Sequence, residues 1–99
     1  MALSINWTKR ATQSFHKTTD YIEKKWGENI AKNFVLDLNR FLNLLSNNPE
    51  IGKLEIEDKG IRAYVSSKQT TILYRIKGDK IILLNLFDNR QHPLKKFKL

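Results

Sequence analysis

The sequence contains no cysteine, two prolines, four glycines and no long apolar run. Without cysteine, disulfides and thiolate metal sites are excluded. The two histidines, His16 and His92, lie far apart in the sequence, so we expect no metal site, and we expect no cofactor. The most apolar stretch, residues 81–87, is interrupted by Asn85 and is much shorter than the roughly 20 residues that span a bilayer. We therefore expect no membrane helix.

The N-terminal residues carry no basic stretch followed by an apolar run, which is the pattern of a secretory signal. This favours a cytoplasmic location. The chain has 99 residues, of which 40% are hydrophobic and 28% charged, and chains of this size seldom form two independent cores. We therefore expect one domain over residues 1–99, with residues 88–99 forming a polar, basic C-terminal tail.

Basic residues exceed acidic residues by 18 to 10, and the excess lies in one segment. Residues 1–59 contain nine basic and eight acidic side chains, whereas residues 60–99 contain nine basic and two acidic side chains. A cationic excess confined to one segment favours a surface that binds phosphates or an acidic protein. The alternative is a basic protein whose charge serves only solubility.

Two stretches have apolar residues at helical spacing. The first predicts an amphipathic helix over about residues 9–25, with Thr8 as its N-cap. Gly27 interrupts the pattern, and a second apolar stripe predicts a longer helix that ends near Ser46, before Pro49. Because the link between them is so short, the two helices should form a hairpin.

Four other stretches alternate apolar and polar residues as strands do: residues 3–7, 61–65, 71–76 and 81–87. Residues 49–60 are rich in charge and contain both a proline and glycines, so they predict a solvated connector. Residues 77–80 contain the Gly-Asp pair of a tight turn. The last three strands should therefore form an antiparallel meander.

The element order predicts an α+β fold of the type β-α-α-β-β-β, in which the helix hairpin covers one face of a four-stranded, mainly antiparallel sheet. If Ile61, Ala63 and Val65 face the helices, then Arg62 and Tyr64 face away. The same alternation in the next two strands completes a mixed cationic, aromatic and apolar set on the open face: Arg62, Tyr64, Leu73, Arg75, Leu83 and Phe87.

Six short motifs coincide with the boundaries of these elements: Ile5-Asn6-Trp7-Thr8 followed by Ala11, Tyr21-Ile22 with Trp26-Gly27, Asn48-Pro49-Glu50-Ile51-Gly52, Gly60-Ile61-Arg62, Ile72-Leu73-Tyr74-Arg75-Ile76, and Asp88-Asn89-Arg90-Gln91-His92-Pro93. In this order and spacing they resemble the RelE/ParE superfamily of toxins from bacterial type II toxin-antitoxin systems. The resemblance implies a microbial-ribonuclease-like fold, growth inhibition, plasmid stabilisation, and a silencing antitoxin encoded next to the toxin.

The resemblance leaves two activities open. RelE-like members cut messenger RNA on the ribosome, and ParE-like members poison DNA gyrase without being nucleases. If the chain is a ribonuclease, it needs a cation at the phosphorane oxygens and groups that move protons. The residues that could supply them are Arg62, Arg75, Arg90 and His92. The stretch from Lys53 to Lys59 matches the region where some relatives place a base, but its alignment assigns none.

Two features favour the ParE-like branch. The tail offers Phe97 where several RNA-cleaving relatives have a tyrosine, and phenylalanine cannot donate a proton. The long helix hairpin, bent at Trp26-Gly27, also resembles ParE-like members more closely. We therefore rank a gyrase poison first and a ribosome-dependent endoribonuclease second, so whether the chain is an enzyme stays open. A third alternative is a non-toxic nucleic-acid-binding domain that uses the basic segment.

The resemblance also indicates what should cover the open face of the sheet. Leu73, Leu83 and Phe87, beside Arg62 and Arg75, should form an exposed apolar and basic patch, and such patches mark interaction sites. An amphipathic antitoxin segment is the expected occupant. On this interpretation, replacing Leu83 with Glu weakens the antitoxin complex. The oligomeric state is not indicated.

Overall fold

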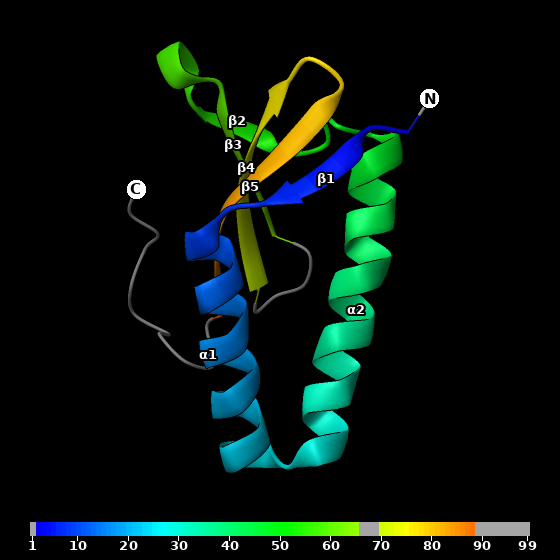
Figure 1. The fold of residues 1–99 in the computed structure, drawn as a ribbon, viewed down its shortest axis with the longest axis vertical. Coiled ribbons are helices and arrows are strands. Elements are labelled where there is room, and N and C mark those ends of the chain that lie inside the picture. Colours follow the sequence, from blue (N-terminus) through cyan, green and yellow to red (C-terminus); the bar gives the residue numbers. More distant parts are fainter. Residues whose placement is uncertain (1, 66–69, 89–99) are drawn as a thin grey trace.

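The computed structural model describes residues 2–65 and 70–88 of the chain, and Figure 1 shows their arrangement. The elements are β1 (Ser4–Trp7), α1 (Lys9–Trp26), α2 (Glu28–Asn47), β2 (Lys53–Ile56), the short 3-10 helix η1 (Glu57–Lys59), β3 (Ile61–Val65), β4 (Thr70–Lys77) and β5 (Lys80–Asp88). Of the helices in this described part, none is long and apolar enough to cross a membrane.

Local signals define both ends of α1. Thr8 has an extended backbone, and its hydroxyl accepts the amide hydrogen of Ala11 at 3.1 Å. At the other end Gly27 adopts a φ of +97°, which L side chains rarely adopt, and it separates α1 from α2. The two predicted helices and their hairpin are therefore confirmed, with ends within one residue of those expected. Figure 1 shows the tip of this hairpin extending beyond the sheet.

Thr8→Ala is expected to lower the free energy of unfolding by about 1 kcal/mol, the usual cost of losing an N-cap. The reason is that one hydroxyl both caps α1 and donates to the carbonyl oxygen of Leu83 at 2.7 Å. Urea unfolding followed by circular dichroism measures the change. Thr8→Ser keeps the hydroxyl and serves as the control. Equal midpoints for the alanine variant and the wild type would contradict a stabilising cap.

The five strands form one sheet in the order β1-β5-β4-β3-β2. β1 runs parallel to β5, and all other neighbours are antiparallel. The predicted α+β class and mainly antiparallel sheet are therefore confirmed. The sheet nevertheless has five strands where four were expected, because β2 lies within the predicted connector. The charged residues of this segment led to the prediction of a connector. They are compatible with a strand here because β2 is an edge strand whose side chains are mostly exposed.

The main core lies between the two helices and one face of the sheet. The helices bury Ala11 and Ile22 from α1, together with Ala31, Phe34, Leu38, Phe41, Leu42 and Leu45 from α2. The sheet contributes Ile72, Tyr74, Ile81, Leu83 and Leu86. Aromatic contacts connect the layers, since the rings of Phe41 and Tyr64 stack with centroids 4.8 Å apart. We call this side of the sheet the helix face and the other side the second face.

The predicted orientation of β3 is wrong. Arg62 pairs with Tyr74 and Tyr64 pairs with Ile72, so Arg62 and Tyr64 lie on the helix face. Directly opposed residues of antiparallel strands share a face. The prediction failed because β3 has apolar or aromatic residues at both parities, so alternation alone could not orient it. Ile61 and Ala63 therefore lie on the second face, where they too are buried.

The predicted orientation of Leu83 is also wrong, and a bulge explains the error. Leu73 pairs with Asn85 whereas Tyr74 pairs with Leu83, so β5 has one extra residue, Leu84, at this point. A bulge shifts the alternation of all later residues. Leu83 consequently lies on the helix face at 2% exposure, and Leu73 is fully buried on the second face. Neither leucine forms part of an exposed patch.

Candidate functional site

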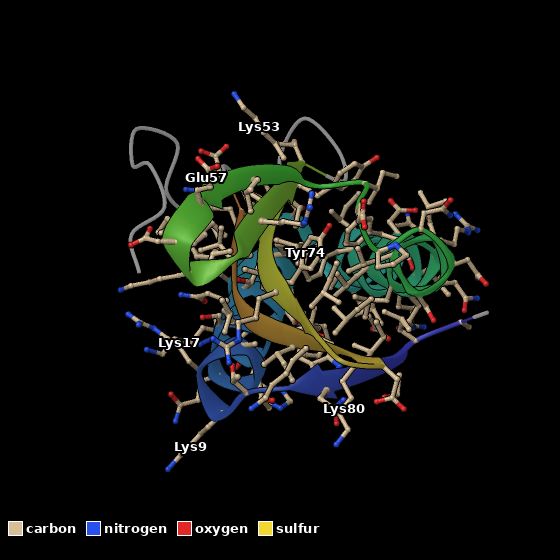
Figure 2. The ribbon with its side chains drawn as sticks, turned by 90° about the horizontal axis from the view of Figure 1, so that it is seen from above. Lys9, Lys17, Lys53, Glu57, Tyr74 and Lys80 are labelled. Carbon is tan, nitrogen blue, oxygen red and sulfur yellow. The ribbon has the colours of Figure 1, made fainter. Side chains whose placement is uncertain are left out.

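Tyr74 on β4 connects the sheet to the segment that follows α2. Its side chain is fully buried, and Figure 2 shows it pointing from the sheet toward α2. The hydroxyl donates to the carbonyl oxygen of Pro49 at 2.8 Å and accepts the amide hydrogen of Gly52 at 2.8 Å. One phenol group thus holds both ends of residues 49–52, while Glu50 and Ile51 between them are exposed.

Burial raises the pKa of the Tyr74 phenol, and the hydrogen bond from Gly52 and the charge of Arg62 oppose this shift. The phenol therefore stays protonated at neutral pH and can donate to Pro49. Close packing accompanies these bonds: a Cβ atom at Gly52 would lie 2.6 Å from the Tyr74 hydroxyl oxygen. Only glycine fits at this position without movement of the tyrosine or the loop.

Arg62 reinforces the same loop. Its guanidinium nitrogen Nη1 donates to the carbonyl oxygen of Gly52 at 2.8 Å and to that of Glu50 at 3.4 Å. Hydrogen bonds from a charged donor are stronger than neutral ones. Arg62 and Tyr74 therefore fix the course of residues 49–52 from two neighbouring strands. The segment, which we call the clamped loop, begins directly after α2.

Of the predicted catalytic residues, the two that the structure describes, Arg62 and Arg75, lie on different faces of the sheet. Arg62 lies on the helix face, whereas Arg75 pairs with Ile61 and lies, half-buried, on the second face. Arg90 and His92 are outside the described residues. Of the six residues predicted for antitoxin binding, Arg62, Tyr64 and Leu83 are on the helix face. Leu73, Arg75 and Phe87 are on the second face, and Phe87 is half-buried there.

This arrangement can position a loop, but it does not aim Arg62 and Arg75 at one point. Arg62 directs donors toward main-chain oxygens, and Arg75 is on the other side of the sheet. Among residues 2–65 and 70–88, no group of three or more histidine, aspartate or glutamate side chains is placed to hold a metal ion. His16 is exposed on α1.

Sequence reasoning missed the Tyr74 to Gly52 contact. The available signal was the short segment from Pro49 to Gly52 at the end of a helix, since a proline followed by a glycine marks a tight change of direction. Which strand residue would meet it depends on register. Alternation predicts only that Tyr74 lies on the side of its strand opposite Leu73 and Arg75, and it identifies no partner for the hydroxyl.

Comparison with known families provides one match over most of the chain. A model of the ParE toxin of type II toxin-antitoxin systems, parDE, matches residues 5–93. A search of curated proteins finds no significant match.

Several solved structures have the same fold. A chain of the chromosomal ParDE toxin-antitoxin system from P. aeruginosa superposes with a TM-score of 0.74 at 22% identity, covering 88% of this chain and 96% of that one. A chain of the toxin-antitoxin complex RelBE2 from Mycobacterium tuberculosis gives a TM-score of 0.67 at 19% identity, covering 89% and 99%. A double mutant of E. coli toxin RelE in the free state gives a TM-score of 0.60 at 12% identity, covering 94% of this chain and 90% of that one. At these identities the likeness concerns the fold.

Proposed function

The chain belongs to the ParE toxin family of type II toxin-antitoxin systems, and on that premise we propose that it inhibits growth by acting on DNA gyrase and is silenced by an antitoxin. Such a toxin acts in the cytoplasm, where gyrase and the antitoxin are found, and it requires no cofactor. The antitoxin partner is supported by structural neighbours that are themselves toxin-antitoxin complexes.

The positions of Arg62 and Arg75 are the observation that favours gyrase over messenger RNA as the target. An RNA-cleaving site stabilises the charge that develops on the phosphorane oxygens with cations aimed at one point. Here the two arginines lie on opposite faces of the sheet, and Arg62 donates to the Gly52 carbonyl oxygen. This arrangement favours a protein that works by contact with its target rather than by cleaving RNA.

The second candidate is a ribosome-dependent endoribonuclease. It is favoured by the shared fold, because a RelE toxin superposes over 94% of this chain. In that case Arg75, together with Arg90 and His92 from the C-terminal segment, is the set to test. The two candidates differ in the nucleic acid that is cut, so a parallel assay separates them.

Production of the chain alone is expected to arrest a bacterial host, and co-production of the antitoxin is expected to restore growth. The purified chain should then produce gyrase-dependent double-strand breaks in plasmid DNA and no codon-positioned cuts in translated messenger RNA. Toxin pre-mixed with its antitoxin is the control, and it should be inactive in the gyrase assay.

Each other outcome identifies a different function. Codon-positioned cuts in messenger RNA without gyrase-dependent breaks would assign the chain to the endoribonucleases. Arg75→Ala should then lower cleavage by roughly 10²–10³, the usual loss for one transition-state donor. Normal growth, with neither gyrase-dependent DNA breaks nor messenger RNA cuts, would favour a non-toxic binding domain.

A further inference from the structure

One side of α1 carries a row of cations. Arg10, Lys17 and Lys24 follow at seven-residue intervals, which is close to two helical turns, and Lys25 lies beside the last of them. At 1.5 Å per residue, the row from Arg10 to Lys25 is about 22 Å long. All four side chains are exposed. The row is therefore straight and accessible along nearly the whole helix.

A hydrogen bond shows which way this row faces. Ser14, which lies between Arg10 and Lys17 on α1, donates from its hydroxyl to the side-chain oxygen of Asn85 on β5. Asn85 pairs with Leu73 and so lies on the second face of the sheet. At about 100° per residue, all four cations lie within about 80° of Ser14 around the helix. The row thus borders the second face.

The acidic residues of α1 lie farther around the helix from Ser14 than the four cations of the row do. Its two acidic residues, Asp20 and Glu23, lie about 120° and 180° from Ser14 and so project away from the second face. The first eleven residues of the helix, 9–19, contain no acid. On this side the helix therefore presents cations to whatever approaches the second face.

The sheet extends this asymmetry. Arg75 lies on the second face and pairs with Ile82, which is next to Leu83, the residue whose carbonyl oxygen binds Thr8 at the start of α1. The opposite edge of the sheet, in β2 and η1, has mixed charge: Glu55, Glu57 and Asp58 lie there together with Lys53 and Lys59. Figure 2 shows Lys9 and Lys17 on the α1 side and Glu57 at the other edge. Among the described residues, α1 and Arg75 thus place several cations along one side of the second face.

From this asymmetry we infer that the cationic row of α1, together with Arg75, binds the sugar-phosphate backbone of duplex DNA. Duplex DNA carries one negative charge per roughly 1.7 Å of its axis when both strands are counted, so a duplex as long as the row carries about 13 charges in all. A row of cations can bind such a regularly charged polymer in many registers. A folded acidic protein instead has carboxylates at irregular positions, so it would bind well only if their spacing matched that of the row.

The form of the row favours a duplex over a single strand. Duplex DNA is straight over this length, because its persistence length is about 50 nm. Binding of single strands usually depends on aromatic side chains that stack on bases. The side of α1 that carries the row has one aromatic ring, Tyr21, and this ring already contacts Trp26 edge-on with centroids 5.9 Å apart. The inference rests on the proposed function, in that gyrase acts on duplex DNA.

The test measures binding of the full chain to a 20-base-pair duplex by fluorescence anisotropy at several salt concentrations, without gyrase. The variant R10Q/K17Q/K24Q removes three cations of the row. A matched control, K32Q/R40Q/K53Q, removes three cations elsewhere: two are paired with Glu28 and Asp37 on α2, and the third lies on β2. Thermal unfolding confirms that both variants are folded.

For the wild type we expect the logarithm of the association constant for the duplex to fall linearly with the logarithm of the salt concentration. The row variant should reduce that slope by about 2.7, or 0.9 for each lost phosphate contact, and should weaken binding about tenfold or more at 0.1 M salt. The control should keep the wild-type slope to within about one lost contact.

Three outcomes would overturn the inference. The first is equal behaviour of the row variant and the control. The second is tighter binding to a single-stranded RNA of equal length, and the third is equal or tighter binding to polyglutamate, which would make the row a contact for an acidic protein. Because gyrase is absent, failure here leaves the gyrase proposal intact, and failure of the gyrase assay leaves duplex binding measurable.

Discussion

Leu83→Glu is expected to abolish the folded state. Leu83 is 2% exposed and packs in the core between the helices and the sheet. An ionised carboxylate there loses its hydration, and its effective cost of several kcal/mol compares with a total stability of about 5–15 kcal/mol for a domain of this size. The purified variant should show no cooperative thermal transition and no near-ultraviolet circular dichroism.

Leu36→Glu is the matched control, because the same change is made at a leucine that is 52% exposed on α2. Lys32 and Arg40 lie one turn to either side and can accommodate the new charge. The stability of this control should remain within about 0.5 kcal/mol of the wild type. A folded Leu83→Glu variant with an unchanged melting temperature would contradict the bulge and return Leu83 to the surface.

Gly52→Ala is expected to destabilise the protein by about 3 kcal/mol, the upper end of the usual cost of overpacking. The added Cβ would lie 2.6 Å from the Tyr74 hydroxyl oxygen and 2.8 Å from a ring carbon. The ring cannot easily move away, because Tyr74 is fully buried. For a domain of this size, that loss lowers the melting temperature by about 12–24 °C. Glu50→Ala, in the exposed part of the clamped loop, is the control and should change little.

A double-mutant cycle with Tyr74→Phe tests the cause. On its own, Tyr74→Phe leaves the Gly52 amide and the Pro49 carbonyl without their hydroxyl partner and should cost about 1–3 kcal/mol. In that background the closest clash of Gly52→Ala is gone, so the double variant should lose less stability than the two single losses added together. Strict additivity would show that the hydroxyl is not what excludes a Cβ at Gly52.

The two helices could be predicted closely because their ends depend on neighbouring residues. Thr8 caps the first turn of α1 through a contact three residues away, and Gly27 ends the helix through its own backbone conformation. The sides of the strands could not be predicted in the same way. They depend on pairing between distant residues, and the extra residue Leu84 in β5 reverses the alternation partway along the strand.

The site was harder to predict than the fold for the same reason. The register between β3 and β4 pairs Arg62 with Tyr74, so these two residues share a face; a shift of one residue would pair Arg62 with Arg75 instead. The sequence pattern showed that arginines and apolar residues alternate in β3 and β4, but apolar residues occupy both parities. The basic excess of the chain could be counted in advance. Which face of the sheet the row on α1 borders becomes known only from the hydrogen bond between Ser14 and Asn85, which orients the helix.

The parallel pairing of β1 with β5 has a consequence for how the protein is made. Residues 4–7 are synthesised well before their partners, residues 80–83, and the Thr8 hydroxyl binds a carbonyl oxygen 75 positions later in the chain. At typical synthesis rates of 5–20 residues per second, β1 waits about 4–15 s for its neighbour. The nascent chain thus has no complete sheet until β5 has been synthesised, and β1 stays without its neighbouring strand until then.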